Sequence, residues 1–250
     1  MPDYLSVSQV TTYLGCPRKY RFRYIDSLEA ERKSADLAFG SAVHSAIEWW
    51  QRERIVGRAP PDEDVLRVFH ADWTAQNALG DLDFDGDDPA EMRALGEAIL
   101  HLFVERFANE VPVAVEERFE VPLRDPRTRD NLPLPLVGFL DFTGEGLVGE
   151  IKTTARKSGP GQWILQLSAY SYAMREITGV RPRLRVVQLV KTKVPKIEVE
   201  DLTLTDRDEA WFVEIAAEVL DSITRGAFFP IPSWMCSRCE YRRACRHSVS

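Results

Sequence analysis

Two acidic residues and a lysine stand in a pattern that suits divalent-metal chemistry. The segment VGFLDF contains Asp141, and after a four-residue link the segment LVGEIKT contains Glu150 and Lys152. If the link is a tight hairpin, Asp141 lies either opposite Val148 and diagonal to Glu150, or directly opposite Glu150. Both registers place the two carboxylates on one face within roughly 5–8 Å. Lys152 projects from that same face, because side chains alternate along a strand.

Carboxylate oxygens are the ligands that Mg²⁺ and Mn²⁺ prefer in proteins. A lysine beside such an ion can orient or deprotonate a water, or stabilise negative charge that builds on a phosphate. The competing interpretation is a salt bridge on a half-exposed sheet face. The D…ExK spacing alone does not decide between the two.

Two further pairs of polar residues lie at helical spacing. The segment GSAVH places His44 on a helix, with Glu48 one turn later on the same face. Gln166 and Tyr170 are likewise one turn apart, on the helix that follows the ExK strand. Taken singly, His44 could be a packed or surface histidine, Gln166 a helix-edge residue and Tyr170 a core residue. We interpret Glu48 as at most an outer neighbour of a metal site.

The four cysteines are unevenly placed. Cys16 stands alone, whereas Cys236, Cys239 and Cys245 form a C-x2-C-x5-C pattern near the other end. No secretory signal and no run of about 18 apolar residues occurs, so we expect a cytoplasmic protein without a membrane span. Disulfides are rare in that compartment. Four thiolates suit either zinc or an iron–sulfur cluster, and four unrelated thiols are the third interpretation.

The motifs occur in the order of a known family. GxxxH (Gly40–His44), GxxD (Gly138–Asp141), ExK (Glu150–Lys152) and QxxxY (Gln166–Tyr170) resemble the RecB-like branch of the PD-(D/E)XK nucleases. The segment SVSQVTTYLGCPRKYRFRY and the closing cysteines resemble the iron–sulfur segments of AddB-type nuclease domains and CRISPR-adaptation nucleases. The resemblance extends from about residue 6 to residue 245. One departure is the Gly149-Glu150 pair, where many relatives have an aspartate within an apolar run.

The resemblance implies roles for individual residues. A catalytic Mg²⁺ or Mn²⁺ would be held by His44, Asp141 and Glu150, with the Ile151 carbonyl as a further ligand. Lys152 would be the catalytic lysine. Gln166 and Tyr170, the two remaining residues of the motifs, would position the DNA strand or the other residues of the site.

The resemblance also implies a second metal centre and an activity. Cys16, Cys236, Cys239 and Cys245 would hold a 4Fe–4S cluster, with zinc as the alternative. The reaction would be metal-dependent DNA cleavage that leaves 5′-phosphates. We expect an exonuclease for single-stranded or end-bearing DNA in repair, recombination or CRISPR adaptation, with a helicase or a CRISPR-adaptation protein as a candidate partner.

Basic residues suited to phosphate contacts cluster beside the cysteines and directly after the ExK strand. Aromatic residues alternate with them, as in Tyr20, Phe22 and Tyr24, which suits an unpaired strand. The residues expected to bind DNA are Arg18, Lys19, Arg21, Arg156, Lys157, Arg242 and Arg243, and Arg246 lies in the same cluster. For each cluster alone, ordinary solubilising charge is the alternative.

The periodicity of the sequence predicts a mixed α/β (α+β) fold in a single domain over 1–250. The resemblance implies a restriction-endonuclease-like mixed sheet flanked by helices, with an N-terminal helical segment (1–110), a catalytic α/β core (111–226) and a cysteine-rich iron–sulfur lobe (227–250) closed by Cys16. The predicted helices are 6–24 with a break at Pro17, 39–56, 62–79, 89–109, 161–178 and 205–225. The predicted strands are 113–123, 136–142, 147–152, 183–190 and 196–199.

The net charge of −7 over 250 residues is unusual for a DNA-binding protein. However, the loop from Asp81 to Glu91 contains six acids and no base, so the rest of the chain sums to −1. This loop imitates the start of an EF-hand, but the required glutamate would fall at Met92. The overall charge therefore does not exclude a basic surface near the site.

Two other functional classes fit less well. A non-catalytic DNA-binding or scaffolding module would not need the complete set of His44, Asp141, Glu150 and Lys152. A sugar or nucleotide phosphatase would be expected to contain a glycine-rich phosphate loop, and the sequence has none.

Overall fold

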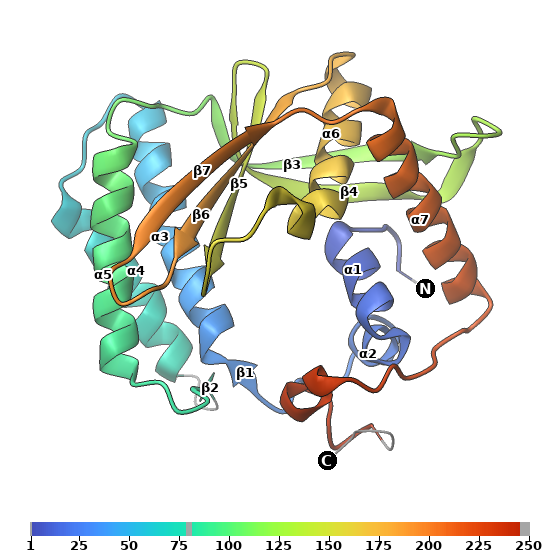
Figure 1. Cartoon of the computed structure of the whole chain (residues 1–250), viewed down its shortest axis with the longest axis horizontal. Helices are drawn as coiled ribbons and strands as arrows, with labels where there is room; N and C mark the ends of the chain where they lie inside the picture. The colour runs from blue at the N-terminus through green and yellow to red at the C-terminus, as the bar shows by residue number, and fades with distance from the viewer. Residues whose placement is uncertain (1, 79–81, 246–250) are drawn as a thin grey trace.

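In the computed structural model, the chain forms a mixed sheet with helices on both faces (Figure 1). The structure describes residues 2–78 and 82–245, so Asp81 and Arg246 lie outside the described residues. Within these residues the largest sheet has the strand order β3-β4-β5-β6-β7, in which only β5 and β6 are parallel neighbours. The strands are β3 (Ala114–Arg124), β4 (Asn131–Gly144), β5 (Leu147–Thr154), β6 (Arg183–Val190) and β7 (Lys196–Leu202). The predicted mixed α/β fold is confirmed.

The helices begin and end within a few residues of their predicted positions. They are α1 (Val7–Gly15), α2 (Pro17–Tyr20), the π-helix η1 (Arg21–Ile25), α3 (Ala35–Ile55), α4 (Asp62–Ala78), α5 (Pro89–Arg106), the 3₁₀ helix η2 (Pro160–Trp163), α6 (Ile164–Thr178), α7 (Asp206–Thr224) and the 3₁₀ helix η3 (Trp234–Arg238). Ser6 caps α1 by accepting a hydrogen bond from the Gln9 N–H, and the predicted break falls at Cys16, just before Pro17. Two short parallel strands, β1 (Lys33–Ser34) and β2 (Leu82–Asp83), were not predicted, because two-residue strands leave no periodic pattern.

None of the helices in the described part of the chain has the length and apolarity that a membrane span requires.

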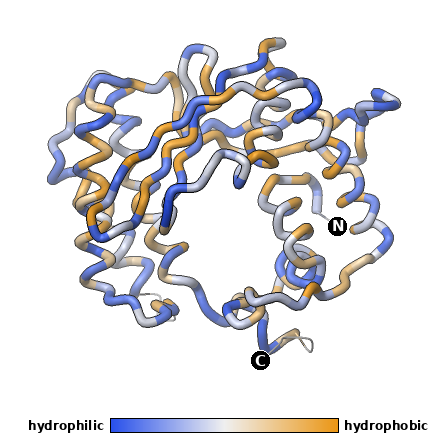
Figure 2. Tube along the Cα trace, in the orientation of Figure 1, coloured by the Kyte–Doolittle hydropathy of each residue, from blue (hydrophilic) through white to orange (hydrophobic). Residues whose placement is uncertain are grey.

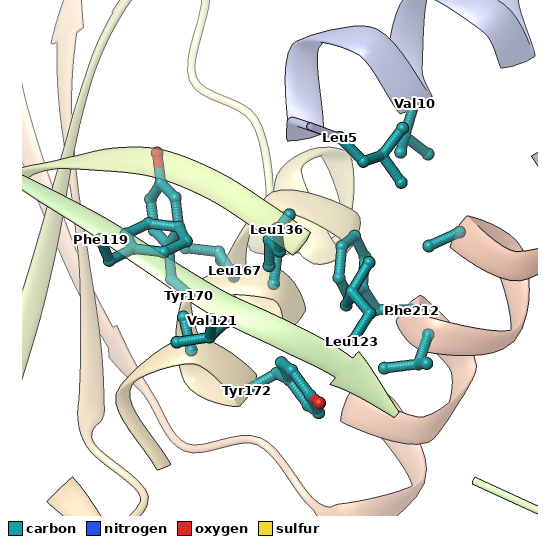
Figure 3. Packing of buried hydrophobic residues seen from close by; sticks show 14 of the residues in the cluster. Leu5, Val10, Phe119, Val121, Leu123, Leu136, Leu167, Tyr170, Tyr172 and Phe212 are labelled. Carbon is teal, nitrogen blue, oxygen red and sulfur yellow. The ribbon is translucent and has the colours of Figure 1, made fainter. Parts of the chain in front are cut away.

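Two hydrophobic cores lie on opposite faces of the sheet. The α3-side core joins α3, α4 and α5 to the sheet and contains residues such as Trp50, Phe69 and Phe103. The α6-side core joins α1, α6 and α7 to the other face and contains Leu136 and Phe212 (Figure 3). Hydrophobic residues accordingly concentrate along the central strands and the helix faces that cover them (Figure 2).

Strand β5 contributes alternate residues to the two cores. Val148 belongs to the α6-side core, whereas Ile151 belongs to the α3-side core. Because side chains alternate along a strand, Glu150 and Lys152 project from the face that α6 covers. Ile151 therefore points into the opposite core, away from Glu150.

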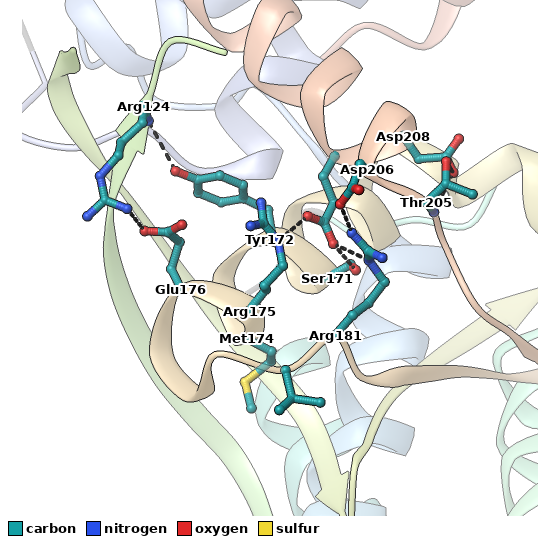
Figure 4. A network of polar contacts seen from close by, with 12 residues as sticks. Arg124, Ser171, Tyr172, Met174, Arg175, Glu176, Arg181, Thr205, Asp206 and Asp208 are labelled. Carbon is teal, nitrogen blue, oxygen red and sulfur yellow. Dashed lines mark hydrogen bonds and ion pairs between the residues drawn. The ribbon is translucent and has the colours of Figure 1, made fainter. Parts of the chain in front are cut away.

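A buried ionic network fixes α6 against α7 (Figure 4). Glu209 of α7 is only 1 % exposed and accepts hydrogen bonds from Ser171 Oγ (2.6 Å), Arg175 Nε (2.5 Å) and Arg181 Nε (2.8 Å). Burial alone would raise the pKa of Glu209, but the three donors lower it. The carboxylate therefore stays charged, and helix α6, which includes Gln166 and Tyr170, has a defined position over the sheet.

The N-terminal segment around α2 and the C-terminal segment 227–245 lie side by side (Figure 1). The Arg18 N–H donates to the Phe229 carbonyl at 3.1 Å, and the Glu31 N–H donates to the Glu240 carbonyl at 2.9 Å. Lys19 forms an ion pair with Glu240 at 2.9 Å. These contacts bring Cys16 next to the C-terminal cysteines.

Two glycines beside the site are required by close aromatic rings. A Cβ atom on Gly138 would lie 2.5 Å from the ring of Phe119, and one on Gly149 would lie 1.9 Å from the ring of Phe142. The ring over Gly149 belongs to its cross-strand neighbour Phe142.

We therefore expect Gly149→Ala to destabilise the protein, because the new methyl group overlaps the ring of Phe142. The free energy of unfolding, measured by denaturant titration, should fall by about 1–3 kcal/mol. Gly161→Ala is the matched control, since no atom lies within 4 Å of the corresponding position. Equal stability of the two variants would contradict this packing.

Candidate active site

The β4–β5 hairpin has the register that brings the two predicted carboxylates face to face. Gly144 pairs with Leu147 and Phe142 with Gly149, so Glu145 and Gly146 form the turn, and Gly146 has a φ of +63°. Continuing this register places Asp141 opposite Glu150, which is the second of the two predicted registers. The regular pairing ends before that point, at Phe142 and Gly149.

Where strands β4 and β5 separate, the Asp141 carboxylate accepts a hydrogen bond from the main chain of β5. The Ile151 N–H donates to Asp141 Oδ2 at 2.6 Å. In a continuous antiparallel ladder this N–H would have a carbonyl of β4 as its acceptor. A side chain that replaces a strand carbonyl is held rigidly, so the position of Asp141 relative to β5 is well defined.

The neighbouring β3–β4 ladder is interrupted at the same level. Its paired positions omit Glu116 and Asp141, and Glu116 has a φ of +48°, which is uncommon for a residue with a side chain. On one side of this break, Val115 and Phe142 pack in the α3-side core. On the other side, Phe119 and Leu140 pack in the α6-side core. The β3–β4 ribbon therefore changes face at Glu116 and Asp141.

Glu150 is the most deeply buried charged group of the site, at 3 % exposure. Lys152 Nζ lies 2.6 Å from Glu150 Oε1 and compensates part of its charge. The second oxygen, Oε2, is buried and forms no hydrogen bond with any described residue. An unpaired buried carboxylate oxygen is costly, so its presence indicates a position where a ligand binds.

Helix α3 brings His44 to the same place from the other face of the sheet. His44 Nδ1 lies 4.0 Å from Asp141 Oδ2. Burial lowers the pKa of His44, although the nearby Glu150 carboxylate opposes this effect. The imidazole is therefore neutral near pH 7 and has a nitrogen lone pair available for a ligand.

Burial also governs the ionisation of the two carboxyl groups. It raises the pKa of Asp141 to about 6, although the Ile151 N–H and the Lys152 charge oppose the shift. Burial raises the pKa of Glu150 to about 7, and the negative charge of Asp141 adds to this effect. Two carboxyl groups that share a buried site without a compensating cation resist ionisation together.

Helix α6 places the predicted glutamine and tyrosine above these groups. Gln166 Nε2 donates to the Tyr170 hydroxyl at 2.6 Å. Burial and the neighbouring carboxylates of Glu150 and Asp141 raise the pKa of Tyr170 well above its usual value, so the phenol remains protonated. Its ring packs edge-on against Phe119, with centroids 6.0 Å apart (Figure 3).

The four cysteines line one small cavity of about 30 Å³ between α2 and the C-terminal lobe, the segment 227–245. None of them forms a disulfide, and Cys236 Sγ accepts a hydrogen bond from the Ser233 N–H at 3.3 Å. Burial raises the pKa of the Cys239 thiol. In the ranges 2–78 and 82–245, no group of three or more His, Cys, Asp or Glu side chains is placed so that it could hold a metal ion as it stands.

The basic residues predicted to bind DNA fall into two groups. Several form ion pairs with acids of this chain, and these pairs are Lys19–Glu240, Arg21–Asp26, Lys157–Glu198 and Arg243–Glu31. Arg18, Arg156 and Arg242 form no ion pair with any described residue. Arg18 and Arg242 line the cysteine cavity, whereas Arg156 follows strand β5.

Comparison with known families decides the class of protein. A family model described as the PD-(D/E)XK nuclease superfamily matches residues 4–246. The chain belongs to this superfamily. The sheet and its flanking helices are accordingly the restriction-endonuclease-like fold, as the sequence predicted. No curated protein matches the chain.

One solved structure supports the fold of this PD-(D/E)XK nuclease, and two others are similar at lower TM-scores. A protein named "putative exonuclease" from Eubacterium rectale has 15 % identity and a TM-score of 0.62, over 99 % of this chain and 91 % of that chain. SSO0001 has 15 % identity and a TM-score of 0.47, over 100 % of this chain and 89 % of that chain. LHK-Exo in complex with dAMP has 13 % identity and a TM-score of 0.25, over 79 % and 94 %.

The structure places one acidic residue beside the candidate site that the sequence did not indicate. Burial and the charges of Glu48 and Glu150 raise the pKa of Glu116, so these three carboxyl groups lie near one another. Glu48, expected to be an outer neighbour of the site, also forms an ion pair with Arg52 at 2.7 Å. The segment VEERFE has the alternating pattern of an ordinary strand. Only its positive φ distinguishes Glu116 from the other residues of this strand.

The raised pKa values predict how stability depends on pH. Because the carboxyl groups of Asp141 and Glu150 have higher pKa values in the folded than in the unfolded chain, their contribution to stability is complete at low pH and is lost as the pH rises through about 6 and 7. Without divalent ions, Glu150→Gln should therefore be more stable than the wild type at about pH 8, by about 1–3 kcal/mol, and much less so at about pH 5.5. Denaturant titrations at both pH values measure this.

Glu120→Gln is the control, since Glu120 is exposed and pairs with Arg118 on the same strand. A stability difference between Glu150→Gln and the wild type that does not change with pH would contradict the raised pKa of Glu150.

Proposed function

We propose that this PD-(D/E)XK nuclease is a divalent-metal-dependent exonuclease that acts on single-stranded or end-bearing DNA. The observation on which this proposal rests is the pair formed by the buried Glu150 and the partly buried Asp141, with one unpaired carboxylate oxygen of Glu150 beside Lys152. Such a pair is unfavourable in a protein that binds no cation there. The order of the motifs supports a RecB-like member of the superfamily.

The residues of the site fit Mg²⁺ or Mn²⁺. Asp141 and Glu150 supply hard oxygen ligands, and the neutral His44 supplies a nitrogen. The Ile151 carbonyl is proposed as a further ligand. When bound, the ion would polarise a phosphodiester and lower the pKa of a water molecule.

The protein's own residues would act around that ion. Lys152, now paired with Glu150 Oε1, would turn its ammonium group to the phosphate or to the attacking water. Tyr170 stays protonated and would donate a hydrogen bond, while Gln166 holds its hydroxyl in place. Since the product of this class of cleavage is a 5′-phosphate, the leaving oxygen would be the 3′ oxygen of the neighbouring nucleotide.

The substrate proposal rests on charge and on aromatic residues. Arg18, Arg156 and Arg242 have no acidic partner among the described residues and remain available for phosphates. Lys19, Arg21, Lys157 and Arg243 could join them by exchanging their present partners. Because Tyr20 and Phe22 are buried, they cannot stack on bases, and Trp234, at 79 % exposure, is the better stacking candidate.

We further propose that Cys16, Cys236, Cys239 and Cys245 hold a 4Fe–4S cluster, with zinc as the alternative. The four residues line a single cavity, although Cys16 lies far from the others in sequence. Four free thiols also suit the reducing cytoplasm, where we place the protein. Repair, recombination or CRISPR adaptation, with a helicase or a CRISPR-adaptation partner, is the proposed setting.

Lys152→Ala should abolish Mg²⁺- or Mn²⁺-dependent cleavage of labelled single-stranded and duplex DNA, because the positive charge beside Glu150 is lost. We expect a decrease of at least about 100-fold, the size seen when one group that stabilises developing charge is removed. Lys196→Ala, at an exposed position on β7, is the control. Cleavage by Lys152→Ala at the wild-type rate would contradict the proposal, and an inactive wild type with bound DNA would favour the scaffolding alternative.

Anaerobic purification followed by iron, sulfide and zinc analysis tests the cysteine centre. We expect about four iron atoms per chain and a brown colour. Cys16→Ser should lose the metal, whereas Ser237→Ala, between two of the ligands, should retain it. A folded wild-type protein that contains neither iron nor zinc would contradict the proposed centre.

A further inference from the structure

A completely buried glutamine on β6 binds the main chain of the loop that follows the ExK strand. Gln188 is 0 % exposed. The Ser158 N–H donates to Gln188 Oε1 at 2.9 Å, and Gln188 Nε2 donates to the Ser158 carbonyl at 2.8 Å. One amide side chain therefore satisfies both main-chain groups of a single loop residue.

This glutamine lies directly beside the proposed catalytic lysine. In the parallel β5–β6 pairing, Gln188 is the partner of Lys152, just as Val186 is the partner of Glu150. Paired residues on neighbouring strands project from the same face, so Gln188 belongs to the face that contains the site. The loop that it binds, residues 155–159, begins immediately after β5 and leads to helix α6.

Packing alone does not call for an amide at this position. The preceding β6 residues on the same face, Leu184 and Val186, are both apolar and buried in the α6-side core. A buried amide is unfavourable unless its hydrogen bonds are satisfied, and here the loop alone supplies the partners. The amide and the loop conformation therefore depend on each other.

The loop presents two cations in different situations. Lys157 forms an ion pair with Glu198 of β7 at 2.8 Å, which holds the outer side of the loop. Arg156 is exposed and has no ion-pair partner in the described part of the chain. Arg156 lies in the chain between strand β5 and Ser158, which Gln188 binds. It is therefore the loop cation that remains free to contact a ligand.

We propose that Gln188 is a positioning residue that holds loop 155–159 beside Lys152, so that Arg156 contacts a phosphate of the bound DNA next to the one that is cleaved. This inference rests on the proposed function. A loop that is ordered before binding loses less conformational entropy when the DNA binds, and a fixed guanidinium contributes more to affinity than a mobile one. Gln188 itself touches neither the DNA nor the ion.

Gln188→Leu tests the inference, because leucine has a similar size and cannot bind Ser158. The matched control is Tyr172→Phe. Tyr172 is also buried and also makes two main-chain hydrogen bonds on a different part of the sheet. It accepts from the Arg124 N–H at 3.1 Å (Figure 4) and donates to the Pro122 carbonyl at 2.9 Å. Both variants lose two buried hydrogen bonds, so a merely structural role predicts similar effects.

We expect Gln188→Leu to raise KM for an oligonucleotide at least fivefold, or about 1 kcal/mol, with kcat within twofold of the wild type. Tyr172→Phe should leave both constants near wild type. In a double-mutant cycle with Arg156→Gln, the two effects on KM should not add, because each removes the same phosphate contact. Additive effects, or equal KM values for Gln188→Leu and Tyr172→Phe, would overturn the inference.

Hydrogen exchange separates this inference from the proposed function, because it needs no DNA. Exchange over residues 155–159 should be faster in Gln188→Leu than in the wild type and unchanged in Tyr172→Phe. If the loop responds in this way but the wild type neither binds nor cleaves DNA, the proposed function fails and the phosphate contact fails with it. If the loop does not respond, the positioning role fails even for an active nuclease. Should Gln188→Leu not fold, Gln188→Met replaces it in each measurement.

Discussion

The hydrogen bond from the Ile151 N–H to the Asp141 carboxylate is the contact on which the site depends. It lies where both ladders of strand β4 are interrupted and where the β3–β4 ribbon passes from one core to the other. Side chains of α3, on one face of the sheet, and of α6, on the other face, can both approach a carboxylate at this point. Consequently His44 and Tyr170, which belong to helices on opposite faces, can both neighbour Asp141.

The arrangement that brings these acidic side chains together lowers the stability of the fold. Glu116 has a left-handed backbone conformation, which costs on the order of 1–3 kcal/mol in a residue other than glycine. The buried Glu150 lies close to the partly buried Asp141, and Lys152 compensates only one oxygen of Glu150. The two packed cores supply the stability that tolerates these features. Such local destabilisation is common where a protein binds a cation or a charged substrate.

Much of this fold could be predicted because its elements are long and periodic. Strand β6 begins and ends at the predicted residues, and the break before Pro17 follows from the chemistry of proline. The hairpin left two registers open, since a four-residue link permits two positions for its turn. The structure selects the one with Glu145 and Gly146 at the centre, where Gly146 adopts a positive φ.

Other features depend on tertiary contacts that spacing does not encode. The left-handed conformation of Glu116 has no local signal, because its neighbours alternate as in any strand. The ion pairs of Lys19 and Lys157 join residues distant in sequence, so the sequence could not show which cations are compensated. A signal did exist for Gln188, since one amide within the apolar run VVQLV must find a buried partner.

The central claim is that Asp141, Glu150 and His44 form the binding site of one divalent ion. Anomalous diffraction from crystals grown with Mn²⁺ tests it most directly. We predict a peak about 2.1 Å from a carboxylate oxygen of Asp141 and of Glu150, with a nitrogen of His44 at a similar distance. A crystal of active protein with Mn²⁺ bound elsewhere, and no peak between these three side chains, would contradict the account.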